Sequence, residues 1–151
     1  MPVGLIGKHP GAGDFLRAGL PAGVADALSG WLDIAMADAR LGAGPRFPAL
    51  WDALVPVRFW LGERLLGFAV AGVLAASRDS VGRRAPLAVV CAAPDPAQVP
   101  PPPVLAPGPG WHEAAEAVLA ALATGPLPEP VELGTRLAVL APEPPADAAP
   151  L

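Results

Sequence analysis

The spacing of apolar residues predicts one long helix early in the chain. From Pro21 to Arg40, apolar side chains recur every three or four residues, while aspartates fill the other faces. Gly42 follows as a helix stop. The same spacing predicts a second helix from Trp111 to Ala123, and the proline-bounded segment 45–56 predicts a short helical turn packed on the core. The predicted apolar faces are Val24, Leu28, Trp31 and Ala35 in the first helix, and Trp111, Ala115, Val118 and Leu122 in the second.

Shorter apolar runs predict the strands of a sheet. Residues 3–6 form one strand, residues 57–61 and 66–75 form a hairpin around the sequence GERL, and residues 135–140 form a last strand. The second hairpin run and residues 86–92 (PLAVVCA) are apolar throughout, which is typical of strands covered on both faces. We therefore expect an α/β fold with a central mixed sheet covered by helices on both faces, a three-layer sandwich.

Proline-rich sequence marks the organisation of the chain. Eight of the sixteen residues from Pro94 to Pro109 are prolines, which favours an extended connector over a helix or a central strand. We expect residues 1–141 to form a single domain that contains this connector, residues 94–110, and residues 142–151 to form a disordered tail.

Composition narrows the chemistry and the surroundings of the protein. With 14 acidic and 10 basic residues the net charge is −4, so we expect no nucleic-acid partner. One cysteine, Cys91, and two histidines supply no metal-ligand set, and we expect no metal and no cofactor. No G-x-S-x-G motif is present, and we expect no enzymatic activity. The longest apolar run, residues 65–76, is too short to span a bilayer, so we expect a cytoplasmic protein without membrane insertion.

The sequence GKHPGAGDF, residues 7–15, has two interpretations. Glycines after a strand are able to present backbone amides to a phosphate, and Lys8 adds charge. The spacing, however, matches neither G-x-x-x-x-G-K-[ST] nor G-x-G-x-x-G. We therefore favour a structural turn in which the side chain of Asp14 binds loop amides.

The charged loop SRDSVGRRAP, residues 77–86, also has two interpretations. In the first, the loop fixes its own conformation, because Asp79 lies four residues before Arg83 and Gly82 is free to adopt a positive φ. In the second, Arg78, Arg83 and Arg84 recognise an acidic surface of a partner, because guanidinium groups bind carboxylates in a bidentate manner.

Four blocks in the first part of the chain carry a family pattern. They are GLIGKHPGAGDFLRAGLP, WLDIAMADAR, VPVRFWL and GVLAASRDSVGRRAPL, and they span about residues 4–87. In this order they resemble the TagF (ImpM) family, which is associated with bacterial type VI secretion. The matching positions include Gly7, Lys8, Pro10, Gly13, Asp14, Phe15, Trp31, Arg40, Arg58, Ser77, Asp79, Gly82, Arg83 and Pro86, while Ala39, Val57 and Ala85 depart from the pattern.

The resemblance implies a function as well as a fold. The resemblance implies that this protein is a post-translational repressor of secretion-system assembly, which acts without catalysis by binding a cytoplasmic forkhead-associated scaffold protein. Two alternatives stay open: an anion- or nucleotide-binding enzyme that uses the GKHPGAGD and SRDSVGRR loops, and a structural accessory subunit of the secretion apparatus. The expected partner-binding residues are Lys8, Asp14, Arg17, Ser77, Arg78, Asp79, Arg83 and Arg84.

Overall fold

A computed structural model describes residues 2–103 and 110–142 of the chain. Part of the predicted connector, residues 104–109, and nearly all of the predicted tail, residues 143–151, lie outside the described residues. The strands are β1 (Val3–Gly7), β2 (Leu16–Ala18), β3 (Val57–Leu61), β4 (Ala69–Arg78) and β5 (Arg84–Ala93). The helices are α1 (Ala22–Ala43), α2 (Phe47–Asp52), α3 (Glu63–Leu66), α4 (Trp111–Thr124) and α5 (Pro130–Ala138), with 3₁₀ turns η1 (Gly44–Arg46) and η2 (Pro96–Gln98).

The five strands form one sheet in the order β2-β1-β5-β4-β3. Every pair of neighbours in this sheet is antiparallel, whereas the sequence predicts a mixed sheet. The difference arises because the charged loop is a tight hairpin turn between β4 and β5, so that these two long strands run in opposite directions. The predicted hairpin of β3 and β4 is confirmed, and the short helix α3 lies in its connection.

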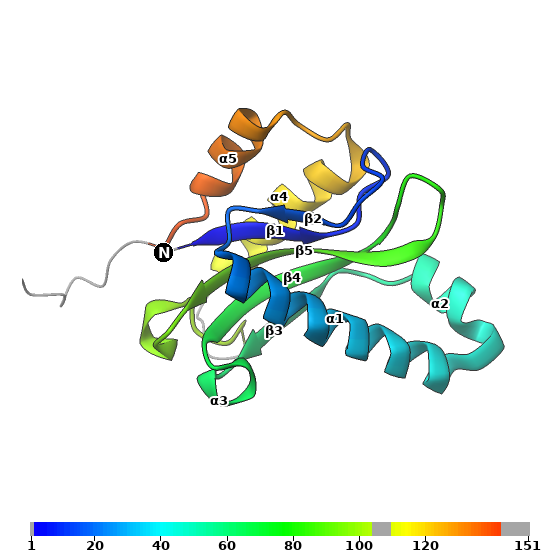
Figure 1. Cartoon of the computed structure of the whole chain (residues 1–151), viewed down its shortest axis with the longest axis horizontal. Helices are drawn as coiled ribbons and strands as arrows, with labels where there is room; N and C mark the ends of the chain where they lie inside the picture. Colours follow the sequence, from blue (N-terminus) through cyan, green and yellow to red (C-terminus); the bar gives the residue numbers. More distant parts are fainter. Residues whose placement is uncertain (1, 104–109, 143–151) are drawn as a thin grey trace, which may run out of the picture.

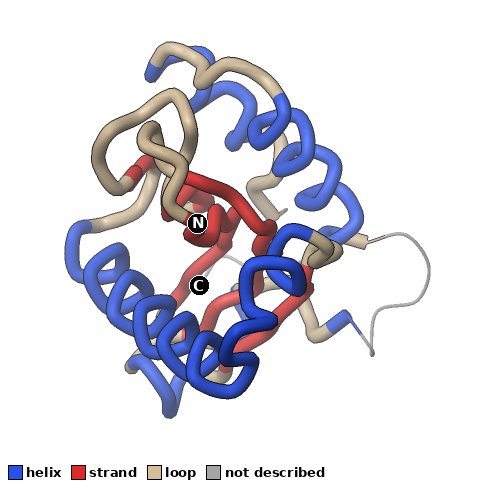
Figure 2. The backbone as a smooth tube through the Cα atoms, turned by 90° about the vertical axis from the view of Figure 1, so that its right-hand side faces the viewer, coloured by secondary structure: helices blue, strands red, loops and turns tan. Residues whose placement is uncertain are grey.

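The sheet is the middle layer of three, which confirms the expected α/β sandwich. Helix α1 lies across one face, and α4 and α5 lie on the other (Figure 1). Figure 2 shows the strands enclosed between the two helical layers. Side chains of β5 alternate between the two cores, since Val89 and Cys91 pack toward α4 while Val90 and Ala92 pack toward α1. This alternation explains why the run is apolar throughout.

The two long helices lie close to where the sequence predicts them, but their buried faces differ in part. Helix α1 buries Ala25, Leu28, Leu32 and Met36, whereas the predicted Ala35 is exposed. Helix α4 buries His112, Ala115, Leu119 and Leu122. The predicted short helical turn is α2, which buries Phe47 and Trp51.

The predicted last strand, residues 135–140, is wrong, because these residues lie mostly in α5. Pro130 occupies the start of this helix, where the missing N–H costs no hydrogen bond. Leu133 and Leu137, four residues apart, form its buried face. The Trp111 indole N–H donates to the Leu140 carbonyl at 2.7 Å and fixes the end of the segment. A short apolar run does not distinguish strand from helix by periodicity alone.

Candidate functional site

The charged loop is the turn that joins β4 to β5. Arg78 and Arg84 are the last paired residues of the two strands. Beyond them, the Asp79 N–H donates to the Arg83 carbonyl, and the Gly82 N–H donates to the Asp79 carbonyl, both at 3.0 Å. Gly82 has a φ of 87°, a conformation that favours glycine, as the sequence predicts. The turn is therefore closed by its own backbone.

The carboxylate of Asp79 is the centre of this turn. It is 2% exposed and accepts hydrogen bonds from the Val81 N–H, the Arg83 N–H and the Arg83 Nε, at 3.1, 2.9 and 2.6 Å. Burial alone raises the pKa of this carboxyl, but the hydrogen bonds from Arg83 and Val81 together bring the pKa below its ordinary value of 3.8. The contacts support the interpretation of a loop that fixes its own conformation.

The two charged loops predicted as one surface do meet in the structure. The Ser77 hydroxyl donates to the Lys8 carbonyl at 2.8 Å, and the Lys8 N–H donates to the Pro86 carbonyl at 3.0 Å. The Lys8 ammonium lies 3.8 Å from the buried carboxylate of Asp79. Backbone and side chain of Lys8 thus connect the loop after β1 to the β4–β5 turn.

Asp52 is a site residue that sequence reasoning missed. Its carboxylate, at the end of α2, accepts two hydrogen bonds from Arg84, at 2.9 and 2.8 Å, and two from Arg78, at 3.2 and 3.1 Å. The hydrogen bonds from Arg84, and the positive charges of both guanidinium groups, lower the pKa of Asp52. No local spacing places residue 52 beside residue 84, so the sequence carries no signal for this contact.

A basic recess lies beside the turn. It has a volume of about 230 Å³, and its lining includes Lys8, Arg40, Arg83 and Arg84 together with Asp33 and Asp79. Arg40 donates to the Arg84 carbonyl at 2.9 Å, which fixes α1 against the base of the turn. The Arg83 side chain is 71% exposed, and only its Nε hydrogen bonds to Asp79. Four basic groups against two acidic groups make this a positive region on an acidic protein.

His9, and not Asp14, fixes the conformation of the GKHPGAGDF loop. The Gly11 N–H donates to His9 Nδ1 at 2.8 Å, and His9 Nε2 lies 2.8 Å from the Leu122 carbonyl. Since Nδ1 accepts, Nε2 carries the proton and donates to Leu122, one of the last carbonyls of α4. His9 is 2% exposed, so this neutral ring joins the loop to the helix in the core.

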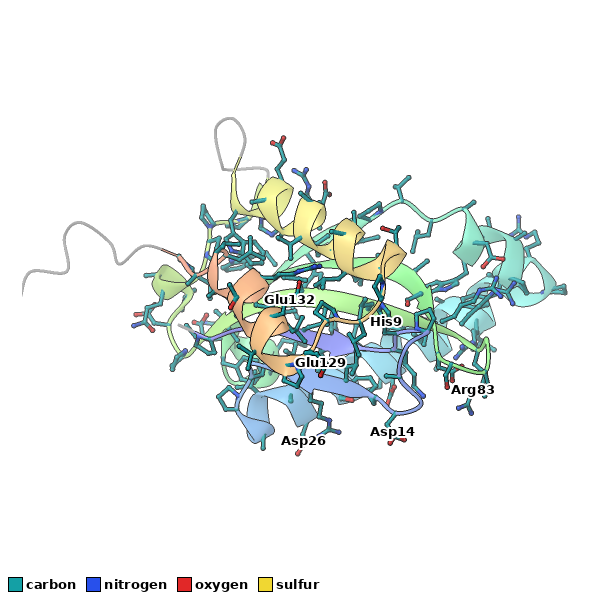
Figure 3. The ribbon with its side chains drawn as sticks, turned by 90° about the horizontal axis from the view of Figure 1, so that it is seen from above. His9, Asp14, Asp26, Arg83, Glu129 and Glu132 are labelled. Atoms are coloured by element: carbon teal, nitrogen blue, oxygen red, sulfur yellow. The ribbon has the colours of Figure 1, made fainter. Side chains whose placement is uncertain are left out.

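Among the described residues, no hydrogen bond or ion pair connects Asp14 or Arg17 to the β4–β5 turn, although Gly13, next to Asp14, faces Ser80 of that turn. Asp14 is exposed and points outward at a separate place from Arg83 (Figure 3). Within residues 2–103 and 110–142, no hydrogen bond or ion pair joins Asp14 to another residue, so its predicted role as the amide-binding group of the loop is wrong. The Arg17 side chain on β2 pairs with Asp26 of α1 and lies over the Phe15 ring. Hydrogen bonds and ion pairs connect the other six of the eight predicted residues at the turn, two of them through Asp52.

These features define a class of protein: a small three-layer α/β domain whose two glycine-containing loops are fixed together at one end of an antiparallel sheet. Comparison with known proteins identifies the family of this domain. A family model described as the TagF N-terminal domain, type VI secretion system-associated, matches residues 4–137, and the chain belongs to this family. The predicted family is thus confirmed, and the protein is associated with type VI secretion.

A solved structure supports the same assignment of the fold. The crystal structure of PA0076 from Pseudomonas aeruginosa PAO1 is 32% identical in sequence, with a TM-score of 0.77. The match covers 95% of this chain and 64% of the PA0076 chain, so this chain spans less than two thirds of that protein. A search of curated proteins found no match. Among the described helices, none has the length and apolar character needed to cross a bilayer.

Proposed function

We propose that this chain is a non-enzymatic, post-translational repressor of type VI secretion system assembly, and that it acts by binding a cytoplasmic forkhead-associated scaffold protein. The proposal starts from membership of the TagF N-terminal domain family and from the resemblance of the four sequence blocks. The observation that assigns the proposed binding to particular residues is the basic recess, a concave surface lined by Lys8, Arg40, Arg83 and Arg84.

An acidic segment of the scaffold protein is the complementary ligand for this recess. Arg78 and Arg84 are held by Asp52, so they serve mainly to position the turn. Arg83 differs, because its terminal nitrogens face solvent while Asp79 holds its Nε and its backbone. A guanidinium positioned in this way binds a carboxylate with little loss of side-chain entropy.

The test is a binding measurement with purified scaffold protein. We expect Arg83→Glu to weaken binding at least tenfold, because the variant replaces the exposed guanidinium by a carboxylate, which repels an acidic ligand. The matched control is Arg46→Glu, a charge reversal at an exposed arginine that does not line the recess. Binding of Arg83→Glu with the affinity of the unmodified chain would remove the basic recess from the contact surface.

Two further measurements separate the alternative functions. Deletion of the gene should raise secretion if the protein is a repressor, whereas deletion of a structural subunit abolishes secretion. The basic recess also fits a small anion, so calorimetric titration with nucleotides and inorganic phosphate, followed by a phosphatase assay, tests the enzyme alternative. Measurable heat of nucleotide or phosphate binding, together with phosphatase turnover, would favour the enzyme alternative over the repressor proposal.

A further inference from the structure

A second concave surface lies away from the basic recess, between β2 and α5. This β2–α5 groove has a volume of about 920 Å³, within the range of ligand-binding clefts. Leu16, Arg17 and Ala18 of β2 line one wall. The lining residues of α5 on the other wall are Leu133, Gly134, Leu137 and Ala138. Leu16 and Ala18 also pack against the core on the α5 side of the sheet. The groove is therefore continuous with the apolar core.

Strand β2 is an edge of the sheet. It pairs with β1 on one side, and the strand order places no neighbour on its other side within the described residues. Edge strands of this kind present unpaired N–H and C=O groups to any extended chain that approaches. Proteins often protect such an edge with a charged side chain, but the charged group of Arg17 is engaged with Asp26 of α1, on the other face of the sheet.

The α5 wall of the groove leaves space for side chains. Small residues, Gly134, Ala138 and Ala141, line it beside Leu133 and Leu137. A Cβ atom at Gly134 would meet no atom within 4 Å apart from its chain neighbours and the backbone of its own helix. A strand added beside β2 would direct every second side chain toward this wall, where small residues would accept large apolar ones.

The charge at the groove favours a basic occupant. Glu129, which lines the groove at the start of α5, has no ion pair or side-chain hydrogen bond among the described residues. Glu132 differs, because it pairs with Arg136 one turn later at 2.9 Å. Figure 3 shows Glu132 on α5 and Glu129 just before the start of this helix. A lysine or arginine of an incoming strand would find its counter-charge at Glu129.

We propose that the β2–α5 groove binds an extended segment of a partner protein, which adds to β2 as a sixth strand. The backbone of the segment pairs with the free edge of β2, its alternate apolar side chains pack against α5, and a basic side chain pairs with Glu129. This surface is separate from the basic recess, so the inference does not depend on the proposed repressor function.

The test begins with random ten-residue peptides displayed on phage and selected on the full chain. Selected peptides are then synthesised, and their binding is measured by fluorescence anisotropy. We expect enriched sequences to alternate apolar residues, to contain lysine or arginine, and to exclude proline from the paired positions, because proline lacks the N–H that pairs with β2. Failure to enrich any peptide, or enrichment of acidic or proline-rich peptides, would overturn the proposal.

Two matched variants locate the binding. Gly134→Leu fills the groove, and Gly30→Leu makes the same change at an exposed position of α1 where a Cβ also meets nothing within 4 Å. Leucine favours a helix more than glycine does, so both variants should remain folded. We expect at least a tenfold loss of peptide binding for Gly134→Leu, no change for Gly30→Leu, and about a threefold loss for Glu129→Gln. Equal binding by Gly134→Leu and the unmodified chain contradicts the proposal.

A measurement on the unmodified chain does not depend on the folding of any variant. Bound peptide should slow amide hydrogen exchange at Arg17, because its N–H points away from β1 and gains a partner, whereas Leu16 and Ala18 already pair with β1. Unchanged exchange there would refute strand addition. Self-association of the chain that Gly134→Leu abolishes, without any peptide binding, would assign the groove to a second copy instead.

Discussion

Replacing His9 by alanine removes the connection between the loop after β1 and the end of α4. In the structure the ring accepts from the Gly11 N–H and donates to the Leu122 carbonyl, both at 2.8 Å, in a site that is 2% exposed. The alanine variant leaves both groups without their partner. A buried polar group that loses its partner costs about 1–3 kcal/mol, and water entering the vacated volume offsets part of this.

We therefore expect His9→Ala to lower the free energy of unfolding by about 3 kcal/mol. For a domain of this size the midpoint of thermal unfolding should fall by about 6–12 °C. Equilibrium unfolding in urea, followed by the fluorescence of the four tryptophans, measures the change.

Two substitutions separate the hydrogen bonds of His9. A glutamine amide nitrogen reaches the position of Nε2, so His9→Gln should keep the bond to Leu122 and recover about half of the loss. An asparagine amide oxygen lies near the position of Nδ1, so His9→Asn should keep the bond to Gly11. The control is Asp14→Ala, an exposed change in the same loop that should shift stability by less than about 0.5 kcal/mol.

One result would refute this reasoning. If His9→Ala unfolds within about 0.5 kcal/mol of the unmodified chain while Asp14→Ala is clearly destabilised, then Asp14 fixes the loop and the assigned role of His9 is wrong.

Three further predictions concern other parts of the fold. A side chain at Gly7, where φ is 127°, would collide with the Pro86 carbonyl, so Gly7→Ala should destabilise the fold by more than about 2 kcal/mol in the same urea assay. Burial, aided by the positive charge of Arg58, lowers the pKa of His112 below 6.5, so the unfolded chain binds the proton more readily than the folded chain. The free energy of unfolding should therefore fall as the pH decreases below about 6.5. Urea titrations at several pH values should show a smaller dependence for His112→Gln. Burial raises the pKa of the Cys91 thiol to about 11, so a thiol-reactive dye should label the protein only after unfolding, and rapid labelling of the native chain would contradict the buried position.

The sequence predicts most of the fold because most of its elements follow local patterns. The long helix α1 with its buried Leu28, the apolar run of β5 and the hairpin of β3 and β4 all fall where expected. Strand β2 is not predicted, since three residues of mixed character carry too little pattern.

The candidate site is predictable only in part. The charged sequence 77–86 and the position of Gly82 identify the turn, and the pairing of Asp79 with Arg83 follows from a spacing of four residues. Asp52 and His9 could not be assigned in the same way. Their partners, Arg84 and Leu122, lie 32 and 113 residues away in the chain, and packing of the layers alone brings them together.

The family, the three-layer architecture and the candidate pairing of Asp79 with Arg83 follow from the sequence alone, because each rests on neighbouring residues or on an ordered series of motifs. The tertiary structure decided which groups hold the loops, and it placed Lys8, Arg40 and Arg83 around one recess and β2 beside α5. The physical reason is the separation of the interacting residues along the chain. Hydrophobic periodicity depends on residues a few positions apart, whereas a buried hydrogen bond or a groove depends on which distant segments the core brings into contact.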